Sequence, residues 1–117
     1  MKDLFDVTGK VALVTGGSRG IGEMIAEGYV SNGVRTYISS RKADACDATA
    51  ERLSKLGECI SSPADLSTAD GIRALVDEIR RHENRLDILV NNAGATWGEK
   101  LEQFPESGWD KIMDINV

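Results

Sequence analysis

The sequence is poor in the residues that build metal centres and disulfide frameworks. Its 117 residues include two cysteines, Cys46 and Cys59, and a single histidine, His82. The cysteines have neither the spacing of zinc ligands nor the pattern of a disulfide framework, and the histidine has no partner ligands. We therefore expect no metal site, and we interpret the cysteines as reduced structural thiols of a cytoplasmic protein.

Long apolar runs and an excess of basic residues are also missing. No apolar run approaches the roughly 20 residues of a membrane span, and Asp3 and Asp6 stand where a signal peptide has its apolar core. Lys and Arg number 14 against 19 Asp and Glu, a formal charge of −5, which disfavours binding to a nucleic-acid backbone. The sequence thus predicts no export, and neither a membrane nor a nucleic acid as partner.

Strand and helix patterns alternate along the chain. Four apolar runs have the length of buried parallel strands, at residues 11–15, 34–40, 59–64 and 86–90. Each is followed by a segment with helical periodicity. This order predicts the α/β class, as a Rossmann-type doubly wound parallel sheet truncated after about four strands. Because the last helical segment runs to the final residue, we expect residues 1–117 to be the N-terminal portion of one domain of this fold.

The helical segments carry apolar stripes and capping residues. In chain order the stripes are Ile21, Ile25, Tyr29 and Val30; Cys46, Ala50 and Leu53; Ile72, Leu75, Val76 and Ile79; and, in a helix from about Pro105, Trp109, Ile112 and Met113. Asp44 is expected to cap the second helix. The third is expected to begin with a capping box, Ser67-x-x-Asp70. These stripes predict the helix faces that pack on the sheet.

A glycine-rich turn links the first strand to the first helix. Its sequence is Thr15-Gly16-Gly17-Ser18-Arg19-Gly20-Ile21-Gly22. Strand, glycine turn and helix in this order direct backbone N–H groups and a helix N-terminus toward a phosphate. We expect Gly16 and Gly17 to permit a sharp turn at the strand end. Gly20 would let the backbone approach a pyrophosphate, and Gly22 would let the helix lie tightly on the sheet.

The second strand ends in cations rather than an acid. The segment is Ser39-Ser40-Arg41-Lys42. An acid at this position accepts hydrogen bonds from the ribose 2′-hydroxyl of NAD, whereas small hydroxyls and an arginine fork suit a 2′-phosphate. Arg19 could reach the same phosphate from the glycine turn. We predict a preference for NADP(H); the alternative is that Arg41 and Lys42 are solvated surface charges.

Two further motifs follow the third and fourth strands. Asp65 is expected at the carboxyl edge of the sheet, where its side chain or the next backbone N–H would bond an adenine; a turn or cap role is the alternative. Asn91-Asn92-Ala93-Gly94 ends the fourth strand, at the edge where open α/β sheets bind ligands. Its small residues would let the backbone approach a ribose, although the motif alone is also compatible with a simple turn.

Together, the glycine turn, Asp65-Leu66, Asn91-Asn92-Ala93-Gly94 and Asn116 resemble the motifs of the short-chain dehydrogenase/reductase family, in matching order and spacing. The resemblance implies an oxidoreductase that transfers hydride between the nicotinamide of NADP(H) and a carbonyl carbon. The cofactor-binding residues that it implies are Gly16, Gly17, Ser18, Arg19, Gly20, Ile21, Gly22, Ser40, Arg41, Asp65, Leu66, Asn92, Ala93 and Gly94.

The resemblance also assigns one catalytic residue. Asn116 matches the asparagine of the family's catalytic tetrad, which holds a water of the proton relay; the other members are a serine and a Tyr-x-x-x-Lys pair. Tyr29 and Tyr37, the only tyrosines, have no lysine four residues on. We therefore expect the serine, tyrosine and lysine to lie beyond Val117, and residues 1–117 alone to be inactive.

Within the family, the sequences around Asp65 and from Asn92 to Gly98 are most similar to 3-oxoacyl reductases of the rhamnolipid-biosynthesis type. The implied substrate is a 3-oxoacyl thioester or another small carbonyl compound. Gluconate- and tropinone-type reductases share much of the pattern, and a non-catalytic NADP(H)-binding protein would keep the cofactor motifs alone. The resemblance further implies that the helix with Trp109 and Asn116 joins a dimer or tetramer interface, although packing within one chain would give the same stripe.

Overall fold

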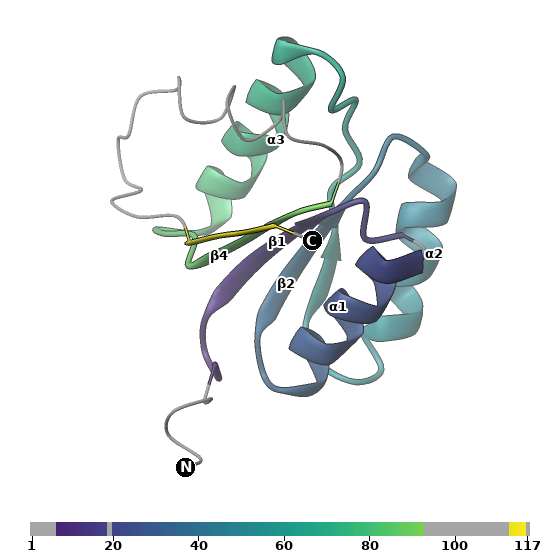
Figure 1. The fold of residues 1–117 in the computed structure, drawn as a ribbon, viewed down its shortest axis with the longest axis vertical. Helices are drawn as coiled ribbons and strands as arrows, with labels where there is room; N and C mark the ends of the chain where they lie inside the picture. Colours follow the sequence, from purple (N-terminus) through teal and green to yellow (C-terminus); the bar gives the residue numbers. More distant parts are fainter. Residues whose placement is uncertain (1–6, 19, 93–112, 117) are drawn as a thin grey trace.

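A computed structural model of the chain describes residues 7–18, 20–92 and 113–116. Strands and helices alternate through most of this range (Figure 1). The elements are β1 (Val11–Thr15), α1 (Gly20–Ser31), β2 (Arg35–Ser39), α2 (Ala43–Leu53), β3 (Cys59–Ser61), α3 (Ala69–His82), β4 (Ile88–Asn91) and β5 (Met113–Asn116). None of the helices in these ranges is long and apolar enough to cross a membrane.

The strands form one parallel sheet in the order β3-β2-β1-β4-β5. The chain first moves outward from β1 to β3 and then returns to the other side of β1 with β4. The strand order therefore reverses at β1. In open parallel sheets, a ligand binds in the crevice outside the carboxyl ends of the strands at such a reversal. The expected Rossmann-type doubly wound fold is confirmed.

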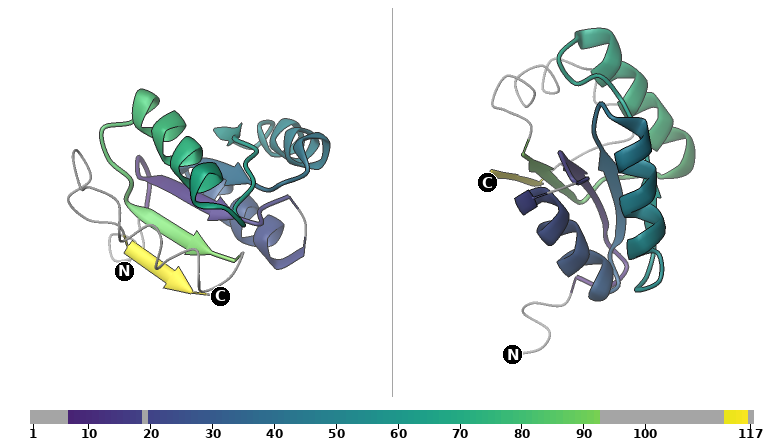
Figure 2. Two further views of the ribbon diagram at one scale, coloured as in Figure 1. Left: turned by 90° about the horizontal axis from the view of Figure 1, so that it is seen from above. Right: turned by 90° about the vertical axis from the view of Figure 1, so that its right-hand side faces the viewer.

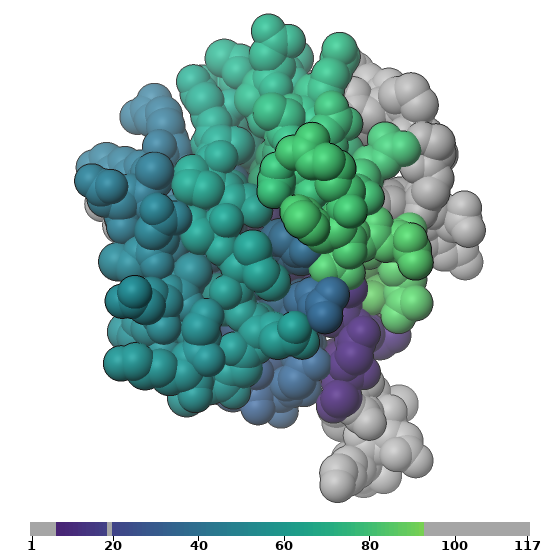
Figure 3. Space-filling view, turned by 180° about the vertical axis from the view of Figure 1, so that it is seen from behind, coloured from purple at the N-terminus to yellow at the C-terminus, as the bar shows by residue number. Residues whose placement is uncertain are grey.

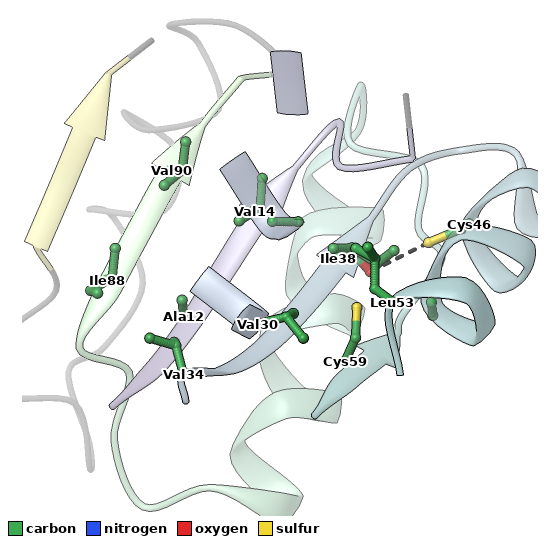
Figure 4. Packing of buried hydrophobic residues seen from close by; sticks show 12 residues of the cluster. Ala12, Val14, Val30, Val34, Ile38, Cys46, Leu53, Cys59, Ile88 and Val90 are labelled. Atoms are coloured by element: carbon green, nitrogen blue, oxygen red, sulfur yellow. Dashed lines mark hydrogen bonds between the residues drawn. The ribbon is translucent and has the colours of Figure 1, made fainter. Parts of the chain in front are cut away.

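Two apolar layers hold the helices on the sheet. The left view of Figure 2 shows α1 and α3 on opposite sides of the sheet. One core cluster joins α1 and α2 to the strands; Figure 4 shows its members, among them Val14, Ile38 and Val90. The other joins α3 to the strand side chains that point to the opposite face of the sheet. Figure 3 views the molecule from behind, where the teal and green atoms of α3 and the segment that follows it cover much of the surface. Residues of each strand alternate between the two layers because successive side chains point to opposite faces.

The stripe expected for α1 is shifted by about one residue. Ile21 is 59% exposed, and Ile25 and Tyr29 are only half-buried. The buried residues of α1 are Gly22, Ala26 and Val30. Small residues on the contact line allow the helix axis to approach the sheet closely, so the larger side chains beside them are left at the edge of the interface.

The caps of α2 and α3 differ from those expected. Lys42 occupies the N-cap position of α2 and makes no side-chain capping bond there, whereas Asp44 lies inside the first turn. A carboxylate in the first turn still interacts favourably with the helix dipole. In α3 the N-cap is Thr68, whose hydroxyl accepts a hydrogen bond from the N–H of Gly71 at 3.0 Å. The N-cap is therefore one residue later than expected, because Ser67 bonds to Asp65 instead, and the expected capping box is wrong, since Gly71 has no side chain to bond back to the N-cap.

The end of the expected last helix is a strand. Met113–Asn116 forms β5 and pairs in parallel with β4, with Asn91 opposite Asn116. The helical stripe pointed to Trp109, Ile112 and Met113, but Met-Asp-Ile-Asn also alternates apolar and polar residues, as strands do. Pairing supplies partners for the backbone N–H and C=O groups along β4, which would otherwise be an open edge. Pro105 and Trp109 lie outside the described residues.

Candidate functional site

The hydroxyl of Thr15 links the ends of β1 and β4. Thr15 is fully buried, and its Oγ1 donates to the carbonyl of Val90 at 3.2 Å and accepts from the N–H of Asn92 at 2.9 Å. On the other side, the N–H of Gly16 donates to the carbonyl of Ser39 at 2.7 Å. The ends of three neighbouring strands are thereby held together where the glycine turn begins.

The glycine turn departs from β1 in a conformation that suits glycine. Gly16 and Gly20 have φ values of +69° and +64°, in the left-handed region that other L-residues rarely adopt. A Cβ on Gly22 would overlap the carbonyl oxygen of Gly16. The expected sharp turn at Gly16 and the close approach at Gly22 are both present, and the amide of Asn92 lies against them, because its Nδ2 is 2.9 Å from the same Cβ position.

Gly17 has a different role from the one expected. Its φ is not positive, so its backbone does not itself need glycine. A Cβ there would lie 2.8 Å from Cγ2 of Ile38 on β2. Gly17 is therefore required for packing between the turn and β2, a neighbour that the local sequence does not reveal.

A first hollow of about 350 Å³ lies between the glycine turn and the start of α2. Its lining residues are Gly16, Ser18, Ser40, Arg41, Lys42 and Ala45. Arg41 and Lys42 are both exposed cations, and none of the described residues that line this hollow is acidic. Its charge and its position between a glycine turn and a helix N-terminus favour a phosphate group.

A second hollow, of about 270 Å³, lies on the Asp65 side of the same strand ends. It shares Gly16, Ser40 and Arg41 with the first and adds Asp65, Leu66 and Ser67. The segment before Asp65 is held in place because the N–H of Ala64 donates to the carbonyl of Ser40 at 3.1 Å. Because they share three lining residues, the two hollows adjoin along the carboxyl edge of the sheet; we refer to the pair as the crevice.

Asp65 is both a turn residue and a wall of the second hollow. Its Oδ1 accepts hydrogen bonds from the hydroxyl of Ser67 at 2.6 Å and from the N–H of Ser67 at 3.0 Å. These bonds lower the pKa of Asp65, and the positive charge of Arg41 adds to the shift. The turn role that the sequence left open is therefore present, and it holds an ionised carboxylate at the edge of the hollow.

The remaining predicted residues are placed unevenly. Ile21 is exposed at the start of α1, and Leu66 lines the second hollow while it packs against the α3 layer. Asn116 lies in β5, opposite Asn91 at the end of β4. Arg19, Ala93 and Gly94 fall outside the described residues.

Two threonines with evident structural roles at the site were not singled out from the sequence. Thr15 joins β1 to β4 as described above, and the hydroxyl of Thr49 on α2 donates to the carbonyl of Ser18 in the glycine turn at 2.9 Å. Both bonds join residues far apart in the chain. A local pattern carries no signal for them, except that a threonine immediately before the glycines is already part of the motif.

Polar atoms without partners remain at the same edge. Within the described ranges, Ser39 Oγ and Asn91 Oδ1 are buried with no hydrogen-bond partner. They belong to the last residues of β2 and β4, the two strands that flank β1. In the same ranges, no three His, Cys, Asp or Glu side chains gather in a group that could hold a metal ion.

The fold and this edge define a Rossmann-type α/β protein whose ligand crevice lies at the reversal of strand order. Residues 10–117 match the model of the family described as short chain dehydrogenase. The rhamnolipid-biosynthesis 3-oxoacyl-[acyl-carrier-protein] reductase of Pseudomonas aeruginosa is 53% identical over the whole chain, which spans 46% of that relative. Gluconate 5-dehydrogenase of Gluconobacter oxydans is 36% identical over 98% of the chain and 45% of the relative.

A solved structure agrees with these relatives. The Pseudomonas aeruginosa RhlG/NADP active-site complex superposes with a TM-score of 0.77 at 53% identity, over 81% of this chain and 38% of that one. The chain belongs to the short chain dehydrogenase family. It spans a little under half the length of the curated relatives described above.

Proposed function

We propose that this chain forms the cofactor-binding part of an oxidoreductase that uses NADPH to reduce a carbonyl group to an alcohol. The observation that carries the proposal is the crevice of two adjoining hollows, which share Gly16, Ser40 and Arg41. One hollow offers cations and a glycine turn, and the other offers a carboxylate beside a half-buried leucine. A phosphorylated adenosine suits both hollows, because its phosphate would lie by the cations and its adenine by the carboxylate and the leucine.

The residues present fit NADP(H) in particular. A side chain at Gly22 would displace the carbonyl of Gly16 and distort the turn against which the phosphates would lie. Arg41 and Lys42 would hold the 2′-phosphate, and Asp65 would accept from the adenine amino group. When bound, the cofactor supplies the hydride that reduces the carbonyl carbon. Asn116 would hold a water of the proton relay, as the family resemblance implies.

The substrate that we favour is a 3-oxoacyl thioester. Support comes from the relative at 53% identity, whose name specifies a 3-oxoacyl-[acyl-carrier-protein] substrate. A gluconate-type substrate is the second candidate, because gluconate 5-dehydrogenase is also a relative. A non-catalytic NADP(H)-binding role is the third. We further propose that the full-length protein acts as a dimer or tetramer in the cytoplasm.

Cofactor preference is tested by titration of the full-length protein with NADPH and NADH. NADPH should bind more tightly, and Arg41→Ala should weaken NADPH binding by about tenfold or more, because a hydrogen bond to a charged group contributes about 1.5–3 kcal/mol. Lys55→Ala removes an exposed cation beyond the far end of α2 and is the matched control, with unchanged affinity expected. Equal affinities for NADPH and NADH in the parent protein would overturn the NADP(H) assignment.

The substrate is tested with the same preparation. Initial rates of NADPH oxidation with a 3-oxoacyl thioester should exceed those with 5-keto-gluconate at equal concentration. The opposite order would favour the gluconate-type reaction. Tight NADPH binding without turnover on either compound would favour the non-catalytic role.

A further inference from the structure

Thr49 lies in the middle of α2, one turn beyond the part of the helix that borders the first hollow. A threonine inside a helix commonly bonds its hydroxyl to a carbonyl three or four residues earlier in the same helix. Thr49 Oγ1 donates instead to the carbonyl oxygen of Ser18, 31 residues earlier in the chain, at 2.9 Å. The residue is buried, with 8% of its surface exposed. This bond joins α2 directly to the glycine turn.

The partner of Thr49 is part of the hollow wall. Ser18 lines the first hollow together with Arg41 and Lys42, whereas Thr49 lines neither hollow. A carbonyl oxygen directed into a phosphate site would repel the ligand, because both carry negative charge. The bond to Thr49 holds the Ser18 carbonyl toward α2.

The helix that carries Thr49 is itself held in place by other contacts. One turn earlier, Cys46 Sγ donates to the carbonyl of Ile38 on β2 at 3.4 Å (Figure 4). One turn later, Arg52 pairs with Glu23 and Glu27 on α1. Thr49 thus lies between two contacts that join α2 to β2 and to α1.

We propose that Thr49 is a positioning residue for the cofactor: its hydroxyl fixes the Ser18 carbonyl and pre-organises the glycine turn for phosphate binding. This inference rests on the proposed NADP(H)-binding function. Without the hydroxyl, the Ser18 carbonyl loses its partner in a half-buried environment and the turn relaxes to satisfy it. The cofactor then has to restore the turn on binding, which weakens affinity.

The test compares NADPH dissociation constants of the full-length protein and three variants. Thr49→Val keeps the shape of the side chain without the hydroxyl and should weaken NADPH binding by about tenfold. Thr49→Ser keeps the hydroxyl and should bind like the parent. Ser54→Ala is the matched control, because it removes a hydroxyl at the other end of α2 that donates to the carbonyls of Ala50 and Cys59; its affinity should be unchanged.

Steady-state kinetics separate positioning from general stability. In Thr49→Val the KM for NADPH should rise while kcat stays within about twofold of the parent. If the parent binds NADPH and Thr49→Val binds it equally well, the inference is wrong and the proposed function stands, even if the variant melts at a lower temperature. If the parent does not bind NADPH, both fail. Should the valine variant not fold, Thr49→Ala, which has no donor in its side chain, takes its place with the same expectation.

Discussion

Individual glycines of the turn have distinct physical roles. Gly16 and Gly20 are needed for their backbone conformation, whereas Gly17 and Gly22 are needed because a Cβ would meet neighbouring atoms. The sequence already predicted the sharp turn at Gly16 and the close approach at Gly22, but it grouped Gly17 with Gly16 as a turn glycine. The packing role of Gly17 comes from the structure alone, because the side chain nearest to its Cβ position is that of Ile38 on β2.

Replacement of Gly22 tests the close approach. Gly22→Ala should lower the free energy of unfolding by about 1–3 kcal/mol, because its Cβ overlaps the backbone carbonyl of Gly16 and the turn must shift. Gly28→Ala is the control on the same helix. Gly28 has no atom within 4 Å of its Cβ position, so alanine should stabilise α1 by about 0.5–1 kcal/mol. Urea unfolding of both variants measures the difference. An unchanged free energy of unfolding in Gly22→Ala would contradict the close approach of Gly22 to Gly16.

The two cysteines should be inert in the folded protein. Cys46 and Cys59 are buried free thiols, and burial, with a smaller effect from the nearby Cys46, raises the pKa of Cys59 to about 11. The thiolate is the reactive form, so a raised pKa keeps Cys59 unreactive at pH 8. We expect a chromogenic disulfide reagent to titrate neither thiol in the native protein and both in guanidinium chloride. Rapid reaction of either thiol in the native protein would show that the apolar layer between α2 and the sheet opens readily.

At the scale of elements, local sequence patterns predicted which helices and strands form better than they predicted where each one begins and ends. The apolar stripes of α2 and α3 are buried as expected, because apolar residues three and four apart over two turns specify one face of a helix. The cap of α3 shifted because Ser67 bonds to Asp65, and Thr68 accepts from the N–H of Gly71 instead. The stripe through Met113 predicted a helix where β5 forms, since four residues are too few for the periods of helix and strand to be told apart.

The cap of α3 can be assigned by mutation. Thr68→Ala should reduce stability by about 1 kcal/mol, because the N–H of Gly71 loses its side-chain acceptor. Ser67→Ala should leave the helix end intact, since Ser67 bonds to Asp65 and not to α3. Thermal melts of the two variants distinguish them. A larger loss of stability in Ser67→Ala than in Thr68→Ala would indicate that Ser67 caps the helix, as the sequence suggested.

At the scale of the whole molecule, the two edges of the sheet are built differently. At the amino edge, Arg35 pairs with Glu58 at 3.2 Å and with Glu83 at 3.0 Å. The hydroxyl of Tyr37 donates to Glu83 at 2.7 Å, and burial, followed by that bond, raises the pKa of Tyr37 far above its usual value. The carboxyl edge instead keeps two cationic side chains beside open hollows. Among the described residues, Arg35 is thus held in ion pairs at the amino edge, whereas Arg41 and Lys42 at the carboxyl edge form none.

This arrangement predicts that residues 1–117 alone do not turn over. Tyr37 keeps its proton in the bond to Glu83 at the amino edge, and Tyr29 is half-buried on α1 with its pKa raised by burial. Neither is placed to donate a proton to a ketone at the opposite edge. NADPH absorbance should therefore stay constant when a 3-oxoacyl thioester is added to the 117-residue chain, whereas the full-length protein should consume it. Substrate-dependent oxidation by the short chain would contradict this.

The contacts at the site that the sequence did not predict join residues far apart in the chain. The glycine turn, Arg41 and Asp65 were identified because each follows a recognisable strand, and strand ends meet at one edge of a parallel sheet. Thr49 shows no such signal, because its partner Ser18 lies 31 residues away and its helix position looks ordinary. Contacts between a side chain and a distant backbone carbonyl depend on how α2 lies against the turn, which no local window contains.

The position of Arg41 has a consequence for how cofactor choice can change during evolution or engineering. Arg41 borders both hollows, whereas Lys42 borders only the first and Asp65 only the second. A substitution at Arg41 therefore alters, in one step, both the hollow proposed for the phosphate and the hollow proposed for the adenine. Lys42 is the position at which charge can be adjusted with the least effect on the adenine side. A stepwise path between NADP and NAD use would thus begin at Lys42 and reach Arg41 last.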